Sequence, residues 1–284
     1  MLLMEKNKWS ISITPRHNLF KLDIKELIEY KDLIFLFVKR DFVTVYRQTV
    51  FGPLWHLIQP LITSFTFYIL FSRIAKMGTH NVPPILFYMS ALVMWNFFSS
   101  CVGKSSSVFI ANATIFGKVY FPRLTVPLSF MFSNIISFAF QLFFLLVIIG
   151  IYHFRGYSAD MHWSILLTPF ILLIIGVQGT AMGMLISTLT TKYRDLVFLV
   201  NVGIQLLMYL SPVIYTLDSL EPQLKEYMIF NPMAPCIEFF RYSVCGAGAI
   251  DVKGLAISIA ITLVLAIVAV ITFNKTEKDF IDTV

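Results

Sequence analysis

Charged side chains are scarce in this chain of 284 residues, where Asp, Glu, Lys and Arg together make up only 13%. Soluble domains carry about a quarter of such residues, so the composition argues against a water-soluble fold. Six long stretches contain no charged residue at all: 54–72, 82–103, 124–152, 161–191, 196–217 and 254–274. A bilayer core about 30 Å thick needs roughly 20 apolar residues of helix, and lipid leaves no backbone polar group unpaired. The sequence therefore predicts an all-α membrane protein with six transmembrane helices.

Acidic residues are absent from all six stretches, although the chain contains 16 of them. Carriers coupled to protons or sodium ions keep ionisable groups at membrane depth, so this absence argues against a self-powered transporter. The five histidines are scattered, and no pair has metal-ligand spacing, so we expect no metal site. Only three cysteines occur: Cys101 lies in the second stretch, whereas Cys236 and Cys245 share a later loop, either as free thiols or as a disulfide.

Catalytic machinery is equally scarce in the sequence, because no nucleophile has a base nearby. Gly103-Lys104-Ser105 imitates the end of a phosphate-binding loop, but Phe98 occupies the place of its first glycine and no strand precedes it. Asp41 and Asp195 each stand beside an arginine, which predicts ion pairs at helix ends rather than catalytic acids. We therefore expect no enzyme activity on this chain, and active transport would draw its energy from a second protein.

Basic residues are distributed unequally among the connecting segments. Nine of the 22 Lys and Arg residues precede the first stretch, and sixteen fall in segments on the same side of the membrane. The positive-inside rule places both termini in the cytoplasm, and this distribution argues against nucleic-acid binding. We expect a cytoplasmic N-terminal segment (1–53), without a secretory signal peptide, a transmembrane domain (54–274) and a cytoplasmic tail (275–284).

Residues 33–52 predict an amphipathic helix ahead of the first span. Its apolar side comprises Phe35, Val38, Phe42, Val45 and Tyr46, and its polar side comprises Arg40, Thr44, Arg47 and Gln48, while Leu36 and Phe37 break the pattern. A basic amphipathic helix lies in the membrane interface rather than across it, and Gly52-Pro53 ends it. The helix is either an ordinary anchor or one that also flanks a cytoplasmic portal, for which the candidate residues are Arg40, Arg47, Gly52 and Pro53.

Four of the predicted spans carry patterned faces. In span three, Ser129, Ser133, Ser137 and Gln141 recur at four-residue steps, as do Gly179, Gly183 and Ser187 in span four; both patterns predict helix–helix contacts. Span one carries aromatic residues on one face, namely Phe65, Tyr68 and Phe71, beyond Pro60. Span five carries a stripe of Phe198, Asn201, Gln205 and Tyr209. Amides avoid lipid, so this stripe faces either a neighbouring helix or a hydrated path.

Two loops are too apolar to be merely solvated. In the loop at 104–123, the apolar residues Ile115, Phe116, Val119, Tyr120 and Phe121 require a surface to pack on, either the protein's own helix ends or another subunit. The outer loop at 218–253 predicts two short helices, 220–230 and 234–245, split by Asn231-Pro232. We expect a re-entrant helical pair between spans five and six, because such backbone is tolerated only against protein or water.

Several motifs occur in an order and at spacings that resemble a known family. They are Arg40-Asp41-Phe42, residues 46–55 with Pro60, residues 119–123 with Pro127-Leu128, Tyr193-Arg194-Asp195, residues 211–215, and Asn231-Pro232. Together they cover residues 33–245 and look like the permease subunit of ABC exporters for polysaccharides, although Phe51 stands where that family more often has leucine. The resemblance implies ATP-driven export of a lipid-linked polysaccharide across a bacterial inner (plasma) membrane. O-antigen is favoured; the alternatives are capsule or teichoic acid, or a small-molecule exporter of the same fold.

The resemblance also implies partners and residue roles. A second copy of the chain would complete a channel lined by spans one and five, and two copies of a separate ATPase would hold ATP and Mg²⁺, leaving no cofactor on this chain. The remaining implied partners are the lipid-linked glycan and membrane lipid. The channel-lining candidates are Trp55, Phe65, Tyr68, Phe71, Phe198, Asn201, Gln205, Tyr209 and Tyr215. The candidates for coupling to the ATPase are Ile115, Phe116, Gly117, Lys118, Tyr120, Phe121, Pro122 and Arg123.

Overall fold

The computed structural model describes residues 24–46, 52–119, 121–157, 161–193 and 195–281, and the secondary structure of these residues is helical. The α-helices are α1 (Ile24–Glu29), α2 (Lys31–Tyr46), α3 (Trp55–Phe67), α4 (Pro84–Ser106), α5 (Val108–Ala111), α6 (Ala113–Phe116), α7 (Thr125–Phe154), α8 (Thr168–Lys192), α9 (Leu196–Tyr209), α10 (Pro222–Met228), α11 (Ala234–Cys245) and α12 (Val252–Ile281). Shorter helical turns are η1 (Gly52–Leu54), η2 (Tyr68–Ile74), η3 (Trp163–Leu167) and η4 (Leu217–Ser219).

Within these described ranges, four helices are long and apolar enough to cross a membrane: α4, α7, α8 together with η3, and α12. The other two predicted spans are irregular. Helix α3 passes at Tyr68 into the π-helical η2, and α9 ends at Tyr209 as an apolar helix of 14 residues. The stretch predicted at 196–217 is therefore helical only in its first part. Pro212 explains the early end, because proline lacks an N–H and disfavours helical backbone in the residue before it.

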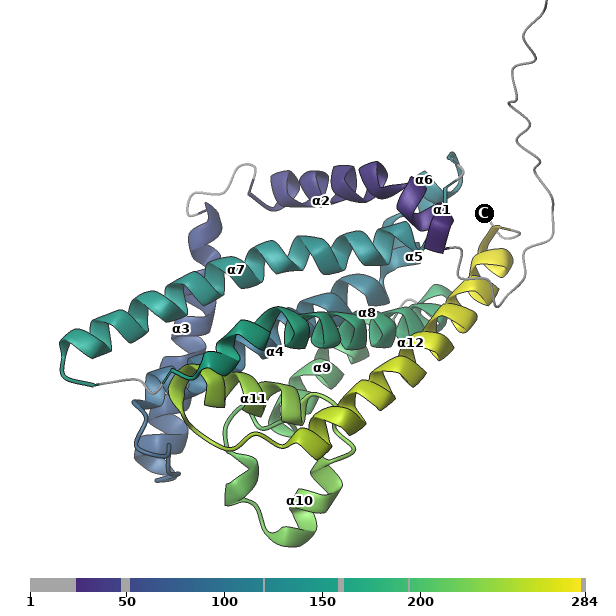
Figure 1. Ribbon diagram of the computed structural model, residues 1–284. Coiled ribbons are helices and arrows are strands. Elements are labelled where there is room, and N and C mark those ends of the chain that lie inside the picture. Colours follow the sequence, from purple (N-terminus) through teal and green to yellow (C-terminus); the bar gives the residue numbers. More distant parts are fainter. Residues whose placement is uncertain (1–23, 47–51, 120, 158–160, 194, 282–284) are drawn as a thin grey trace, which may run out of the picture.

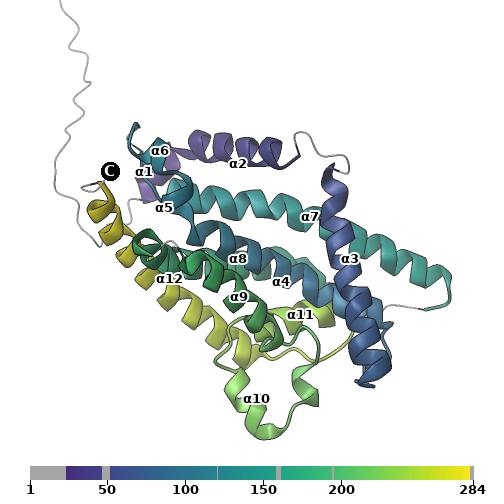
Figure 2. The same ribbon diagram turned by 180° about the vertical axis from the view of Figure 1, so that it is seen from behind.

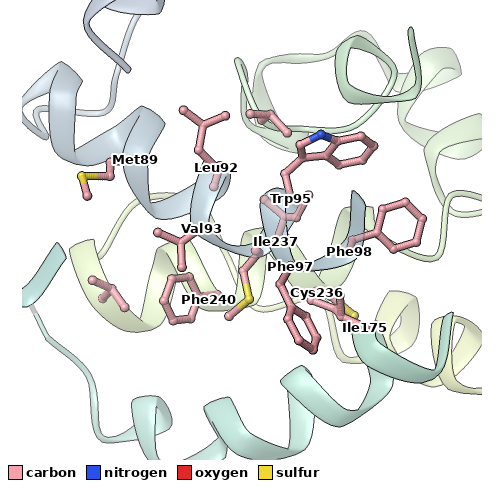
Figure 3. Close-up of a cluster of buried hydrophobic side chains, with 14 of the residues drawn as sticks. Met89, Leu92, Val93, Trp95, Phe97, Phe98, Ile175, Cys236, Ile237 and Phe240 are labelled. Carbon is pink, nitrogen blue, oxygen red and sulfur yellow. The ribbon is translucent and has the colours of Figure 1, made fainter. Parts of the chain in front are cut away.

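Helix α4 lies at the centre of the bundle, between α3, α7, α8, α9 and α11 (Figures 1 and 2). Its residues from Leu86 to Phe98 are buried, with Asn96 as the one partly exposed position. Figure 3 shows Val93 and Phe97 of α4 in the same apolar cluster as Ile237 and Phe240 of α11. A helix segment that is surrounded by other helices is apolar all round, which explains why this part of α4 has no amphipathic pattern.

The glycine face predicted for span four is confirmed by the contact between α4 and α8. A Cβ atom added to Gly179 would lie 2.8 Å from the Cβ of Cys101, and one added to Gly183 would lie 2.5 Å from the Cβ of Ser105. The hydroxyl of Thr190 also donates a hydrogen bond to the carbonyl oxygen of Ser106 at 2.6 Å. Small residues thus let the two backbones approach closely, as expected for helices packed in lipid.

The serine face predicted for span three is also a contact face. Ser129, Ser133 and Gln141 of α7 are buried. The Asn96 side-chain amide of α4 donates to Oε1 of Gln141 at 3.2 Å, which joins the two helices by a polar contact inside the bundle. The expected helix–helix contact is therefore confirmed for this stripe.

The outer loop forms two short helices, as predicted, but they lie in different surroundings. Helix α11 is buried along its length and packs on α4, whereas α10 protrudes from the bundle with its residues exposed (Figure 1). Asp218 and Lys225 form an exposed ion pair of 2.6 Å beside α10. The expectation that both helices tuck into the bundle is thus wrong for α10, whose polar residues favour an exposed position. Cys236 and Cys245 lie on α11 and are free, buried thiols.

Helix α2 forms where a helix was predicted and lies alongside α7 (Figures 1 and 2). Phe35, on the predicted apolar side, is 71% exposed to the surroundings, whereas Phe37, which broke the predicted pattern, is only 5% exposed. The Phe37 ring lies 5.7 Å from that of Phe121, so the loop after α6 decides which face of α2 is buried. Because that partner follows about 80 residues later, the local pattern of α2 could not reveal it.

Candidate translocation face and coupling loop

Two helices present the aromatic and amide residues that the sequence singled out. Helices α3 and α9 both pack on α4 and flank it on the face seen in Figure 2. On α3, Trp55 and Phe65 are about half exposed, with values of 52% and 54%. On α9, Phe198 is 77% exposed. We define the exposed residues of this face as the translocation face: Trp55, Phe65, Phe198, Asn201, Gln205 and Tyr209.

The amides of the translocation face have no partner within the part of the chain that the structure describes. The side chains of Asn201 and Gln205 are exposed on α9 and form no hydrogen bond there. The two alternatives for this stripe, a neighbouring helix or a hydrated path, therefore both stay predictions, since no hydrogen bond joins these amides to another helix of the described residues. In a membrane, an exposed amide is stabilised only by water or by polar groups of another molecule.

The remaining channel candidates are less exposed. The Tyr68 hydroxyl accepts a hydrogen bond from Nε of Arg73 at 2.6 Å, and its ring lies 6.2 Å from that of Phe65. Phe71 packs against Phe67 at a ring distance of 5.5 Å. Tyr215 is half-buried beyond the end of α9. The structure thus brings Tyr68 beside the translocation face but turns Phe71 towards the core.

A buried arginine fixes the turn that follows α9. Arg241 of α11 is fully buried, and its guanidinium donates to three backbone carbonyl oxygens of that turn. Nη1 donates to Tyr215 at 2.9 Å, and Nη2 donates to Val213 at 3.1 Å and to Pro212. A buried charge is tolerated only with such hydrogen bonds. Arg241 therefore sets where the chain leaves α9 and where Tyr215 lies.

Two further contacts support the same turn from α4 and α11. The guanidinium of Arg241 lies over the ring of Phe87, with Cζ 4.2 Å from the ring centroid. Glu238, one helical turn before Arg241, accepts the backbone N–H of Leu217 at 2.9 Å. We did not single out either charged residue from the sequence. The available signal was their three-residue spacing in an otherwise apolar run, because buried charges require partners.

The loop between α4 and α7 packs on the protein's own helices through aromatic rings. Phe116 lies 6.0 Å from Phe109 and 5.8 Å from Phe121, and Phe109 stacks at 4.7 Å on Phe273 of α12. Phe37 of α2 completes this cluster, which we call the aromatic cluster. Two surfaces were considered for this loop, the protein's own helix ends and another subunit. Phe116 and Phe121 pack on the protein's own helices.

Arg123 joins the same loop to the end of α12. Its Nε lies 3.5 Å from Oε1 of Glu277, its Nη1 donates to the backbone oxygen of Glu277 at 3.3 Å, and its Cζ lies 5.0 Å from the ring centroid of Phe116. Burial lowers the pKa of the Arg123 guanidinium, and the Glu277 carboxylate opposes that shift. Arg123 therefore ties the loop to α12, which continues as a helix through residues predicted to be a tail.

Among the described coupling candidates, those at the tip of this loop are open to a partner. Gly117, Lys118 and Val119 are exposed, with Val119 at 59%, whereas Ile115 and Pro122 are partly buried. Tyr120, another coupling candidate, lies outside the described residues. The exposed apolar side chain of Val119 is thus the part of the loop that is free to contact another subunit.

The portal candidates lie on α2 and in the segment that connects α2 to α3. Arg40 and Asp41 form the predicted ion pair, with Nη2 2.9 Å from Oδ1. Gly52 has a φ of 48°, in the left-handed region that glycine adopts most readily. Pro53 lies in η1, directly ahead of α3. Arg47 lies outside the described residues, as does Arg194, the predicted partner of Asp195.

Comparison with known proteins adds independent information. The family described as ABC-2 type transporter matches residues 32–244, from the start of α2 to the end of α11. An O-antigen export system permease protein RfbA of Klebsiella pneumoniae is 28% identical over 249 residues, which are 88% of this chain and 93% of that protein. A protein of the same name from Myxococcus xanthus is 24% identical over 263 residues, covering 92% of this chain and 98% of that protein.

Proposed function

The chain belongs to the ABC-2 type transporter family, and from that premise we propose that it is the permease subunit of an ABC exporter of O-antigen polysaccharide. The observation that carries this proposal is the similarity to O-antigen export permeases over nearly the full length of both chains. Similarity of that extent includes the helices that bear the translocation face. We infer that the exported polymer is lipid-linked and leaves the cytoplasm across the inner membrane.

The proposed topology has six crossings with both termini in the cytoplasm. The four long helices supply four of them, and α3 with η2 and α9 with the following turn supply the other two. Helix α9 is about 21 Å long at 1.5 Å per residue, so it needs the turn at residues 210–217 to complete its crossing. Helix α11 would be the re-entrant element, because it is buried and packs on α4, which is long and apolar enough to cross a membrane. The excess of basic residues on one side supports this orientation.

The proposed path for the glycan runs along the translocation face. A sugar ring has an apolar C–H face that rests on aromatic rings, and hydroxyl groups that bond to amides. Phe198, Asn201, Gln205 and Tyr209 supply both kinds of contact without a fixed charge, so a long polymer can slide. Because these side chains point away from their own bundle, a second copy of the chain would be needed to enclose the path.

We further propose that a separate ATPase binds at the cytoplasmic end and holds ATP and Mg²⁺. The tip of the loop, Gly117 to Val119, is its proposed contact, since the aromatic cluster and Arg123 fix this loop to α2 and α12. A displacement of the tip by the ATPase would then be transmitted to α2 and α12. Membership of an ABC exporter family supports such a partner.

Deletion of the gene tests the function directly. Cells lacking this chain are expected to show no O-antigen polysaccharide on their surface and to accumulate the lipid-linked polymer inside, and both changes should reverse when the gene is restored. Surface polysaccharide can be measured by gel electrophoresis of extracted lipopolysaccharide. Unchanged surface O-antigen in the deletion strain would refute the proposal.

A further inference from the structure

A polar cavity of about 230 Å³ lies among α2, α3, α4 and α7. Seven of its eight lining residues are polar: Asp41, Phe42, His56, Ser100, Lys104, Ser133, Asn134 and Ser137. Ser100 is exposed, so the cavity opens to the surface of the bundle. Water takes about 30 Å³ per molecule, so the cavity has room for much more than one water. Most of the accessible lining is nevertheless apolar, so the cavity suits an occupant that has both a polar and an apolar part.

Lys104 supplies a positive charge to this cavity, and the Asp41 carboxylate of the same lining favours that charge. Its ammonium group forms no ion pair and no hydrogen bond with any residue that the structure describes. Asp41 is the carboxylate in the lining, but its Oδ1 accepts from Nε and Nη2 of Arg40 at 3.1 and 2.9 Å. Arg40 and Lys104 therefore share one carboxylate, which leaves one positive charge in excess around the cavity. An anion in the cavity would balance this excess.

The other lining groups suit the oxygen atoms of an anion. Nε2 of His56 lies 3.3 Å from the hydroxyl of Ser137, and the side-chain nitrogen of Asn134 lies 3.5 Å from the sulfur of Cys101. Hydroxyl, amide and imidazole groups can all donate hydrogen bonds, and such bonds are stronger when the acceptor is charged. The cavity thus combines one cation with several neutral donors.

We propose that this cavity binds the phosphate head group of a lipid, with Lys104 as its counter-charge. Lys104 lies in the last turn of α4, and the proposed topology places that turn at the cytoplasmic surface of the membrane, where lipid phosphates lie. Phe42 provides an apolar wall beside the polar groups, as an adjoining hydrocarbon chain requires. The phosphate belongs either to a bilayer phospholipid or to the phosphorylated anchor of a lipid-linked glycan, and this second source rests on the proposed function.

Binding of farnesyl diphosphate and of farnesol tests the recognition of phosphate. The full-length chain is purified in a detergent that contains no phosphate, and the affinity for each compound is measured by thermophoresis. The wild type should bind farnesyl diphosphate more tightly than farnesol, and Lys104→Gln should lose about tenfold or more of that affinity, as expected for a charge-assisted contact. Equal affinity of Lys104→Gln and wild type would overturn the proposal.

Three further variants separate a binding role from a structural one. Lys104→Arg keeps the charge and should retain most of the affinity. Lys192→Gln removes another lysine from the cytoplasmic end of a helix, outside the cavity, and should bind like wild type. Asp41→Asn should bind farnesyl diphosphate more tightly, because one negative charge leaves the lining. Unchanged or weaker binding by Asp41→Asn would indicate that Lys104 serves only to balance Asp41, which contradicts the proposal even where Lys104→Gln fails to fold.

Competition identifies the source of the phosphate. Phosphatidylglycerol added to the same detergent micelles that displaces farnesyl diphosphate from the wild type but not from Lys104→Gln would assign the cavity to bilayer phospholipid. Failure to displace it, together with reduced surface O-antigen in Lys104→Gln cells, would assign the cavity to the glycan anchor. Both results support a phosphate site. If the proposed function itself is wrong, the result is different, because deletion of the whole gene would leave surface O-antigen unchanged.

Discussion

Replacement of Arg241 by methionine tests the claim that one buried side chain fixes the end of α9. Methionine has a similar length but no donor, so the carbonyl oxygens of Pro212, Val213 and Tyr215 would lose their partner inside the bundle. Each unpaired buried acceptor costs about 1–3 kcal/mol. Part of this loss is offset because methionine avoids the cost of burying a charge.

We expect a net loss of about 3–5 kcal/mol for Arg241→Met, within the range seen when one partner of a buried charged interaction is removed. For a chain of this size, that corresponds to a fall in melting temperature of roughly 10 °C. Thermal unfolding of the detergent-purified protein, followed by size-exclusion chromatography, measures this shift. Export should also fall, since the position of Tyr215 beyond the translocation face depends on this turn.

Two controls make the result interpretable. Arg155→Met removes an exposed arginine beyond the end of α7 and should leave the melting temperature nearly unchanged. Arg241→Lys keeps the charge but lacks the planar group that reaches three carbonyls, so it should give an intermediate melting temperature. A melting temperature for Arg241→Met within about 1 °C of wild type would refute the reasoning, since about 1 kcal/mol already shifts it by a few degrees.

Three further substitutions test separate parts of the structure. Gly183→Ala would place a Cβ 2.5 Å from that of Ser105 and should cost about 1–3 kcal/mol of stability; Gly203→Ala, with open space around it, is the matched control, and equal melting temperatures for the two would contradict the close packing of α4 and α8. Val119→Asp should reduce co-purification of the partner ATPase while leaving thermal stability unchanged, and full retention of the ATPase would remove the loop tip from the coupling role. Gln205→Leu should leave stability within about 0.5 kcal/mol of wild type but lower surface O-antigen, and normal export would exclude this amide from the glycan path.

The positions of the helices could be read from the sequence because lipid imposes one rule on every residue. A segment that crosses the bilayer must be apolar and must pair its own backbone, so the absence of charge marked α4, α7, α8 and α12. Some helix–helix contacts could also be predicted from the sequence. Gly179 and Gly183 indicated such a contact because only small residues permit two helix backbones to come so close.

Contacts between segments that are far apart in the sequence could not be predicted in this way. Phe37 of α2 broke the predicted amphipathic pattern, yet it is buried because Phe121 lies beside it. The early end of α9 depends on Pro212, but the exact course of the following turn depends on Arg241, almost 30 residues later. Such pairs are set by the folded arrangement, and hydrophobic periodicity carries no information about them.

The candidate sites show the same division. The exposed amides of α9 could be inferred, because two amides in an apolar helix are costly unless they meet water or another polar group. The cavity beside Lys104 could not, since its lining comes from four separate helices between residues 41 and 137, and no local pattern shows that they meet. In the sequence alone, Lys104 had only a false resemblance to a phosphate-binding loop.

Reconstitution in vesicles tests the central claim, that this chain is a passive conduit for polysaccharide powered by a partner. The purified chain is inserted into vesicles with or without its ATPase, and transfer of lipid-linked O-antigen is measured as the fraction of glycan that becomes accessible to an enzyme on the opposite side. We predict that glycan accumulates across the membrane only with the ATPase and Mg²⁺-ATP. Concentrative transport by the chain alone would contradict the account.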